Sequence, residues 1–174
     1  MKKKLRENEI VMQLTTEVQS DVLGESLSQI NAMLRAMHLW FHAAHNAAYG
    51  ISFSGDHFSL YSKIYTEIQE EIDSFIEKSM ALTDNQSMAC PIKITSDALQ
   101  LLSQLPSPST LEGCEISEIG RDIVGAYIEL LESSCNLLDS SGLLTLGLDD
   151  QITGSANRHE GYQYLLKQRA IKER

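Results

Sequence analysis

Hydrophobic residues recur at steps of three and four along most of the chain from Ser20 onward. This is the spacing of amphipathic helices, which turn one hydrophobic face toward a core. Four long runs follow it, and they predict helices over residues 20–49, 56–82, 116–140 and 151–170. No run alternates with the period of two that indicates a strand, so the pattern predicts an all-α protein.

The connection between the second and third of these runs is unusually long. It contains all three prolines, at positions 91, 106 and 108, and spans roughly 25 residues. Within it, SDALQLLSQL (residues 96–105) predicts a short helix capped by Ser96. A hairpin, a long crossover and a second hairpin give the connectivity of a ferritin-like four-helix bundle, because an up-down-up-down bundle would not need such a crossover.

The N-terminal residues lie outside the helical pattern. Residues 1–19 begin with MKKKLR, and we expect them to form a flexible, basic-headed tail. The remaining residues, 20–174, are enough for one domain with its own hydrophobic core. The predicted organisation is therefore a tail followed by a single ferritin-like bundle.

The chain is acidic, with 24 Asp and Glu against 14 Lys and Arg and a formal net charge of -10. Binding to phosphate groups depends on clustered Lys and Arg, so this balance excludes a protein that wraps nucleic acid over its whole surface. MKKKLR is the one basic cluster. It is either a weak contact for DNA or an acidic membrane surface, or a solvated terminus that aids solubility.

The cysteines and the hydropathy pattern indicate a compartment. Three cysteines are an odd number, and they include no CxxC pair, which fits a reducing environment. The chain shows no signal-peptide-like segment and no window of eighteen apolar residues. We therefore expect a soluble cytoplasmic protein without a membrane partner.

Three of the five histidines stand close together in the first predicted helix. At about 100° per residue, His38, His42 and His45 fall within roughly 60° of one another and form one stripe. A single histidine beside Trp40 would more often be a core or interface residue than a ligand. Three on one stripe favour metal binding, although one or two of them can still be structural.

The second predicted helix carries a matching stripe of carboxylates, Glu70, Asp73 and Glu77. Imidazole together with carboxylate suits iron, manganese or zinc, and facing bundle helices project such ligands in di-iron proteins. Acidic residues at helical spacing are also typical of a solvated face, which we expect for Glu70 and Glu71. Asp73 and Glu77 flank apolar residues and lie at the edge of the hydrophobic stripe.

One segment carries a family resemblance: AHNAAYGISFSGDHFSLYSKIYTEIQEEIDSFIEK, residues 44–78. It resembles the segment joining the first two bundle helices of the Dps-type mini-ferritins, DNA-protection proteins of the ferritin superfamily. In that family two histidines stand twelve residues apart, followed by an Asp and a Glu four apart near a DxxxER ending. His45 and His57 are twelve apart and Asp73 and Glu77 four apart, with IDSFIEK where that ending would stand. GLDDQITGSANRHEGYQYLLKQ also resembles the last helix of the family.

The resemblance implies a ferroxidase that oxidises Fe(II) with peroxide or oxygen and stores the Fe(III) mineral inside a hollow homododecamer. In the family each iron site lies at a two-fold interface. Carried over, His45 and His57 of one chain would meet Asp73 and Glu77 of its partner. Acidic residues near the start of the last helix line iron-uptake pores in the family, which would give that role to Asp149 and Asp150, although carboxylates also stabilise a helix N-terminus.

Two positions depart from the family pattern. The family usually has another Asp four residues after the second histidine, where this chain has Tyr61. The gap from His57 to Asp73 is also one residue longer than usual, which would rotate the acids by about 100° on a regular helix. A later helix start or a local bulge would absorb the extra residue.

Alternatives remain for both the site and the function. His42, with His38 one turn away, could face Asp73 and Glu77, or His159 and Glu160, inside one subunit and complete an internal metal site. His159 and Glu160 are adjacent, so surface or subunit-contact roles are the simpler expectation for them. For the whole protein, the alternatives to an iron-oxidising shell are a structural or binding shell with a degenerate metal site, and a DNA-binding protein acting through the Lys-rich tail.

Overall fold

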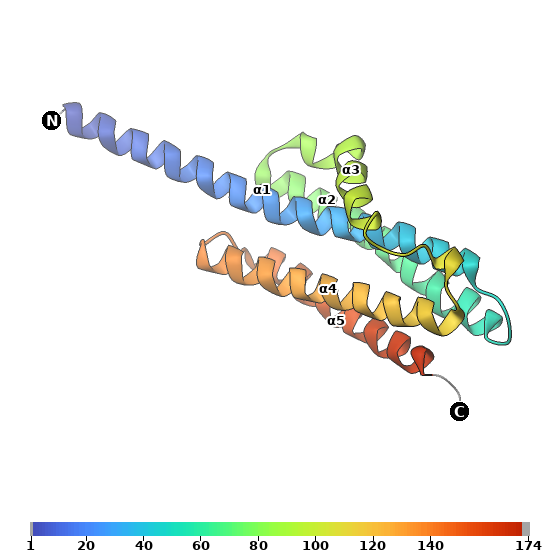
Figure 1. Cartoon of the computed structure of the whole chain (residues 1–174). Helices are drawn as coiled ribbons and strands as arrows, with labels where there is room; N and C mark the ends of the chain where they lie inside the picture. The colour runs from blue at the N-terminus through green and yellow to red at the C-terminus, as the bar shows by residue number, and fades with distance from the viewer. Residues whose placement is uncertain (1, 172–174) are drawn as a thin grey trace.

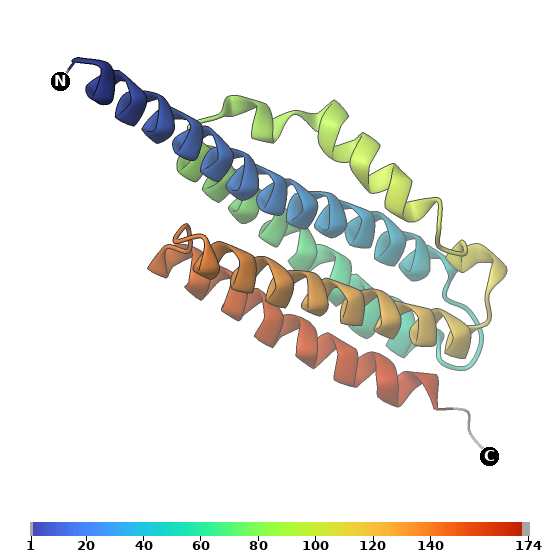
Figure 2. The ribbon, with the colours of Figure 1, turned by 60° about the vertical axis from the view of Figure 1, so that its left-hand side comes forward.

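In the computed structural model, four long helices lie side by side along a common direction, and a shorter helix covers one side of them (Figure 1 and Figure 2). The structure describes the backbone of residues 2–171 and the side chains of residues 21–171. The helices are α1 (Lys2–Ala47), α2 (Ser62–Thr83), α3 (Pro91–Leu102), α4 (Gly113–Ser140) and α5 (Leu146–Ala170). The described residues include no β-strand.

The order of the helices gives the predicted connectivity. α1 and α2 form one hairpin and α4 and α5 a second, and the segment between the hairpins carries α3, which packs on α1. The indole Nε1 of Trp40 donates a hydrogen bond to the carbonyl of Pro106 at 3.1 Å, which ties this crossover to α1. The fold class is therefore confirmed as a ferritin-like four-helix bundle with a long crossover that carries a short helix.

The bundle is held together by the hydrophobic stripes that the spacing predicts. Aliphatic and aromatic side chains from all four long helices meet along the centre. The buried members include Leu27, Ile30, Leu34, Phe41, Ile64, Ile68, Ile72, Phe75, Ile123, Leu131, Ile152 and Leu166. Gly120 lies at the close approach of α4 to α1, where a Cβ would come within 3.0 Å of the Phe41 ring. This glycine therefore allows the two helices to pack closely.

Several helix boundaries differ from the prediction, among them the starts of three helices. α1 begins at Lys2, well before the expected start near Ser20, while the flexibility expected of residues 1–19 stays a prediction. The short crossover helix begins at Pro91 and not at Ser96, because a proline at the first helical position has no amide hydrogen that needs a partner. The last helix begins at Leu146, because the Thr145 side chain caps it by accepting from the Leu148 amide at 3.2 Å.

A buried ion pair fastens the connection between α1 and α2 to the end of α5. Asp56 is almost fully buried, and its two carboxylate oxygens accept from Arg169 Nε at 2.7 Å and from a terminal Arg169 nitrogen at 2.9 Å. Ser52 donates to the same carboxylate at 2.8 Å. The contact therefore restrains the loop that precedes His57.

Candidate metal centre

His45 and His57 form a compact pair at the turn between α1 and α2. Their ring centroids are 3.7 Å apart and the rings are stacked with an interplanar angle of 22°. Nδ1 of His45 lies 2.8 Å from the carbonyl oxygen of His57, and Nδ1 of His57 lies 2.8 Å from the carbonyl oxygen of His45. The sequence spacing of twelve residues thus brings both predicted ligands into one site.

These reciprocal hydrogen bonds decide which nitrogen of each ring remains for a ligand. A carbonyl oxygen only accepts, so Nδ1 must carry the proton in both His45 and His57. In the neutral rings the lone pairs are then on Nε2. Metal-binding histidines typically donate their other ring nitrogen to a backbone carbonyl or a carboxylate in this way, which fixes the tautomer and the ring orientation. Both rings are half-buried, so the pair is oriented while its outer edge stays accessible.

A local bulge, of the kind expected to absorb the extra residue between His57 and Asp73, is present at the start of this interval. Residues Gly55–Tyr61 form a π-helix, labelled η1, that runs directly into α2. A π-helix closes its hydrogen bonds over five residues instead of four, so each turn holds more residues than an α-helical turn. The bulge lies in the interval where the sequence is one residue longer than the family pattern, and it contains His57 itself.

The predicted carboxylates do not reach the histidine pair within one chain. Asp73 and Glu77 are both exposed on α2. Asp73 follows His57 by sixteen residues, which at about 1.5 Å per residue places it roughly 24 Å farther along the helix. Consistent with this separation, the described residues contain no group of three or more His, Cys, Asp or Glu placed to hold a metal ion.

Tyr61 points into the hydrophobic core. It is fully buried, and its hydroxyl lies 2.7 Å from the Ser117 hydroxyl. Burial raises the pKa of Tyr61 to about 12, against the smaller lowering effect of that hydrogen bond. The phenol is therefore neutral and structural, and it supplies no acidic group in place of the usual aspartate.

The other two histidines of the stripe continue along α1 beside Tyr65 of α2. His42 is exposed, and its ring centroid lies 6.3 Å from those of His38 and His45. The Tyr65 ring contacts all three, with centroid distances of 6.1 Å to His38, 4.9 Å to His42 and 5.2 Å to His45. The stripe therefore exists as predicted and is covered on one side by a tyrosine.

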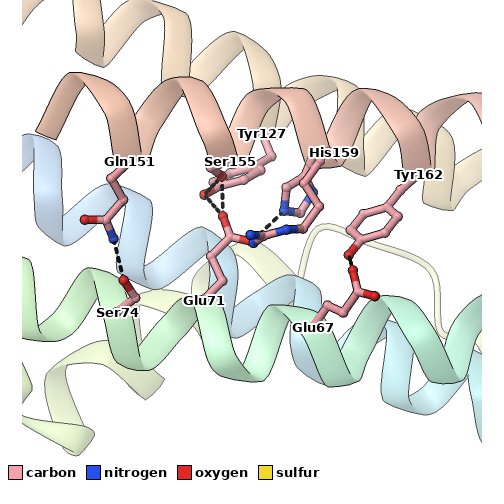
Figure 3. A network of polar contacts seen from close by, with 9 residues as sticks. Glu67, Glu71, Ser74, Tyr127, Gln151, Ser155, His159 and Tyr162 are labelled. Atoms are coloured by element: carbon pink, nitrogen blue, oxygen red, sulfur yellow. Dashed lines mark hydrogen bonds and ion pairs between the residues drawn. The ribbon is translucent and has the colours of Figure 1, made fainter. Parts of the chain in front are cut away.

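A buried polar network inside the bundle was not predicted (Figure 3). Glu71, expected on a solvated face, is buried between α2 and α5. One of its oxygens accepts from Ser155 and from Tyr127 at 3.2 Å. The other is 3.1 Å from His159 Nε2 and accepts from Arg158 at 3.0 Å. A second carboxylate, Glu67, accepts from the Tyr162 hydroxyl nearby.

This network corrects the expectations for Glu71 and His159. His159 is fully buried, whereas a surface or subunit-contact role was the simpler expectation. It does not meet His42, which is exposed, and Glu160 is also exposed. The internal metal site proposed as an alternative is thus not assembled by these residues. The signal that was available is the spacing, because His159 continues the buried stripe of Ile152 and Ser155 at steps of three and four.

Two pKa shifts follow from the network. Burial alone would raise the pKa of Glu71, but the hydrogen bond and charge of His159, the Ser155 hydroxyl and the Arg158 charge outweigh it and hold the pKa below its ordinary value. Burial raises the pKa of Tyr127 well above its ordinary value, and the adjacent Glu71 charge raises it further. Glu71 is therefore ionised and Tyr127 neutral at neutral pH, as their hydrogen bonds require.

An acidic cavity lies over this network. It has a volume of about 500 Å³ and lies between α2 and α5, lined among others by Glu67, Glu70, Asp150 and Arg158. Asp149, in the first turn of α5, is half-buried, and its carboxylate lies 3.9 Å from the Cys135 sulfur. Of the two aspartates expected to line a pore, Asp150 therefore faces an open cavity.

The connectivity, the crossover helix and the paired histidines define a ferritin-like helical bundle of the kind found in Dps proteins. Dps from Thermosynechococcus elongatus superposes with a TM-score of 0.76 at 23% identity, covering 92% of this chain and 96% of that one. Dps from Vibrio cholerae O1 is described as a member of a broad superfamily of ferritin-like diiron-carboxylate proteins. It superposes with a TM-score of 0.73 at 17% identity, covering 87% of this chain and 90% of that one. Dps from Mycobacterium smegmatis superposes with a TM-score of 0.69 at 16% identity, covering 86% of this chain and 87% of that one.

These comparisons bear out the resemblance at the level of the fold, over about nine-tenths of the chain. Neither a protein-family model nor a curated protein sequence matches the chain. Among its described helices, none combines the length and apolar character that crossing a bilayer requires.

Proposed function

We propose that this protein is an iron-binding ferroxidase and iron-storage protein of the Dps type, which oxidises Fe(II) and thereby limits peroxide damage in the cytoplasm. The observation that carries the proposal is the His45–His57 pair, whose reciprocal carbonyl hydrogen bonds leave both Nε2 atoms for a metal ion. The likeness in fold to Dps proteins, one of them described as ferritin-like and diiron-carboxylate, supports iron as the substrate.

In this proposal each iron site is shared between two chains. His45 and His57 lie near the start of α2, and Asp73 and Glu77 lie roughly 24 Å or more along it, so one chain supplies only half of a site. Two copies packed with their α2 helices antiparallel about a two-fold axis would place the histidines of each chain against the acids of the other. Both acids are exposed and free to meet a partner. Because the chain resembles the Dps family, we expect six such dimers to assemble into a homododecamer.

The ligand set suits iron oxidation. Neutral imidazoles hold Fe(II), and the hard carboxylates of Asp73 and Glu77 stabilise the Fe(III) that forms. With peroxide as oxidant, two Fe(II) ions each lose one electron, and the peroxide takes up two electrons and two protons to give two water molecules. The net charge of -10 per chain attracts Fe(II) toward the shell, and the acidic cavity at Asp150 offers carboxylates on its path.

A structural or binding shell with degenerate metal chemistry is the second candidate. It is favoured by Tyr61, because the position of the usual aspartate holds a buried neutral phenol. DNA binding is a weaker possibility for the same shell, since it would depend on the MKKKLR segment and fall steeply with salt.

Anaerobic Fe(II) titration followed by peroxide addition tests the ferroxidase. We expect His57→Gln and Asp73→Asn each to slow oxidation toward the rate of iron alone, and Glu118→Gln, an exposed acid on α4, to leave it unchanged. Oxidation by both site variants at the wild-type rate would contradict the proposal. A size-exclusion mass of about twelve chains tests the assembly separately.

Mixing the two inactive variants tests whether the site is shared. In a dimer of one His57→Gln chain and one Asp73→Asn chain, one site loses both halves and the other keeps both. Random pairing of equal amounts, after dissociation and reassembly, should therefore restore about one quarter of the sites. No recovery in shells that have demonstrably mixed would show that the ligands come from a single chain.

A further inference from the structure

Two histidines next to the His45–His57 pair have no role in the proposed ferroxidase. His38 and His42 stand one helical turn apart on α1, with ring centroids 6.3 Å apart and an interplanar angle of 26°. Tyr65 lies against both rings from α2. Histidines at i and i+4 on one helical face are a recurrent pair of metal ligands, because their nitrogens can converge on one ion.

The spacing of the rings is within reach of one shared cation. With a metal–nitrogen distance of about 2.1 Å and about 1.1 Å from ring centre to nitrogen, two imidazoles on one ion have centroids at most about 6.4 Å apart. His38 and His42 lie just within this limit at 6.3 Å. The limit corresponds to a linear arrangement, so an angular one requires the exposed His42 ring to rotate toward His38.

The His45 ring is also 6.3 Å from the His42 ring, but it is held in place by His57. Its Nδ1 is bonded to the His57 carbonyl, and its ring stacks on His57 at 3.7 Å. This ring therefore cannot turn toward His42 without breaking the pair. His38 has no such hydrogen bond among the described residues, so it is the better partner for His42.

One ring nitrogen of His38 faces the interior, and the other is left for a ligand. Its Nδ1 is buried and has no hydrogen-bond partner among the described residues. Nε2 is then the ring nitrogen that can take a ligand from the solvent side.

We propose that His38 and His42 bind a divalent transition-metal cation at a second site, distinct from the His45–His57 site, with water completing the coordination. Imidazole ligands select borderline cations such as Ni²⁺, Cu²⁺ and Zn²⁺ over the hard cations Mg²⁺ and Ca²⁺. The site is contained in one chain, so it does not depend on the shared ferroxidase site.

Ni²⁺ titration by calorimetry tests this in the full chain, starting from the double variant His45→Gln/His57→Gln so that the first pair is removed. We expect adding His38→Gln or His42→Gln to weaken Ni²⁺ binding at least tenfold, because one of two ligands is lost. Adding Leu39→Gln, an exposed residue between the two histidines, is the matched control and should leave the binding unchanged. Crystals of the double variant soaked with Ni²⁺ should show an anomalous peak between Nε2 of His38 and Nε2 of His42.

Two outcomes overturn the proposal. One is Ni²⁺ affinity that survives removal of His38, and the other is the absence of Ni²⁺ binding by the starting double variant, which would mean that His42 pairs with His45. Circular dichroism of each variant checks that its helices are intact. Iron oxidation is measured separately, so failure of the ferroxidase leaves this result interpretable.

Discussion

Replacing Glu71 with leucine should strongly destabilise the bundle. The buried carboxylate accepts hydrogen bonds from Ser155, Tyr127 and Arg158 and pairs with His159. Leucine would leave His159 and Arg158 without this partner, whereas the hydroxyls of Ser155 and Tyr127 would keep only their contact with each other at 3.0 Å. Each unpaired buried group costs about 1–3 kcal/mol, and removing one member of a buried ion pair costs about 3–5 kcal/mol. We therefore expect a loss of about 4 kcal/mol in the free energy of unfolding.

Glu71→Gln separates charge from shape. The amide keeps the size of the side chain and one acceptor oxygen but loses the charge-assisted hydrogen bonds, so we expect a loss of about 2 kcal/mol. Glu70→Gln changes the neighbouring exposed carboxylate and should stay within about 0.5 kcal/mol of wild type.

Urea unfolding followed by far-UV circular dichroism measures these differences. All variants are compared at one protein concentration, because assembly makes apparent stability depend on concentration. The reasoning fails if Glu71→Leu and Glu71→Gln both unfold within about 0.5 kcal/mol of Glu70→Gln, since the buried network would then contribute nothing measurable.

The same variants give a pH dependence with a definite sign. The pKa of Glu71 is lower in the folded chain than its ordinary value of 4.5. Its charge therefore contributes stability that is fully present above pH 4.5 and is lost as the pH falls through the lower folded value. Below pH 4.5 the advantage of wild type over Glu71→Gln should shrink.

Three further predictions concern other parts of the fold. Arg169→Gln leaves the buried Asp56 carboxylate without its ion pair, and urea unfolding should show a loss of about 2–3 kcal/mol. Gly154→Ala, in open space within α5, should raise the free energy of unfolding by about 0.5–1 kcal/mol in the same assay. Gly120→Val should lower it by about 2 kcal/mol, because the larger side chain overpacks against Phe41. Equal effects of the two substitutions would contradict the packing described for Gly120. Three of the six tyrosines, Tyr61, Tyr127 and Tyr162, have raised pKa values in the folded chain, so the free energy of unfolding should fall as the pH rises above 10. Absorbance at 295 nm, which measures tyrosine ionisation, should show these three ionising only as the chain unfolds.

The bundle was predictable because its main signal is local. Steps of three and four between hydrophobic residues follow from the geometry of one helix, so the four long helices could be read without knowing their neighbours. Their order and the length of the crossover then limited the topology. The helix ends were harder to predict, since a cap depends on one or two side chains. Because Thr145 caps the last helix, α5 begins at Leu146, five residues before the predicted start at residue 151.

The histidine pair was predictable only as a spacing. Twelve residues separate His45 from His57, but the reciprocal hydrogen bonds to each other's carbonyl groups depend on how the turn and the π-helix fold back. That geometry decides the tautomer of each ring. The separation of the acids from the histidines follows from the helical rise, since η1 runs directly into α2.

The interior polar network shows what the sequence by itself left open. The spacing of Glu71 and His159 is compatible with a buried position, but a charged residue is buried only where partners satisfy it. Those partners lie far away in the sequence, since Ser155 and His159 are 84 and 88 residues from Glu71. The sequence thus determined which faces are hydrophobic, a property of each helix alone. Only the tertiary structure decided which polar groups join those faces, because their free energy depends on contacts between helices.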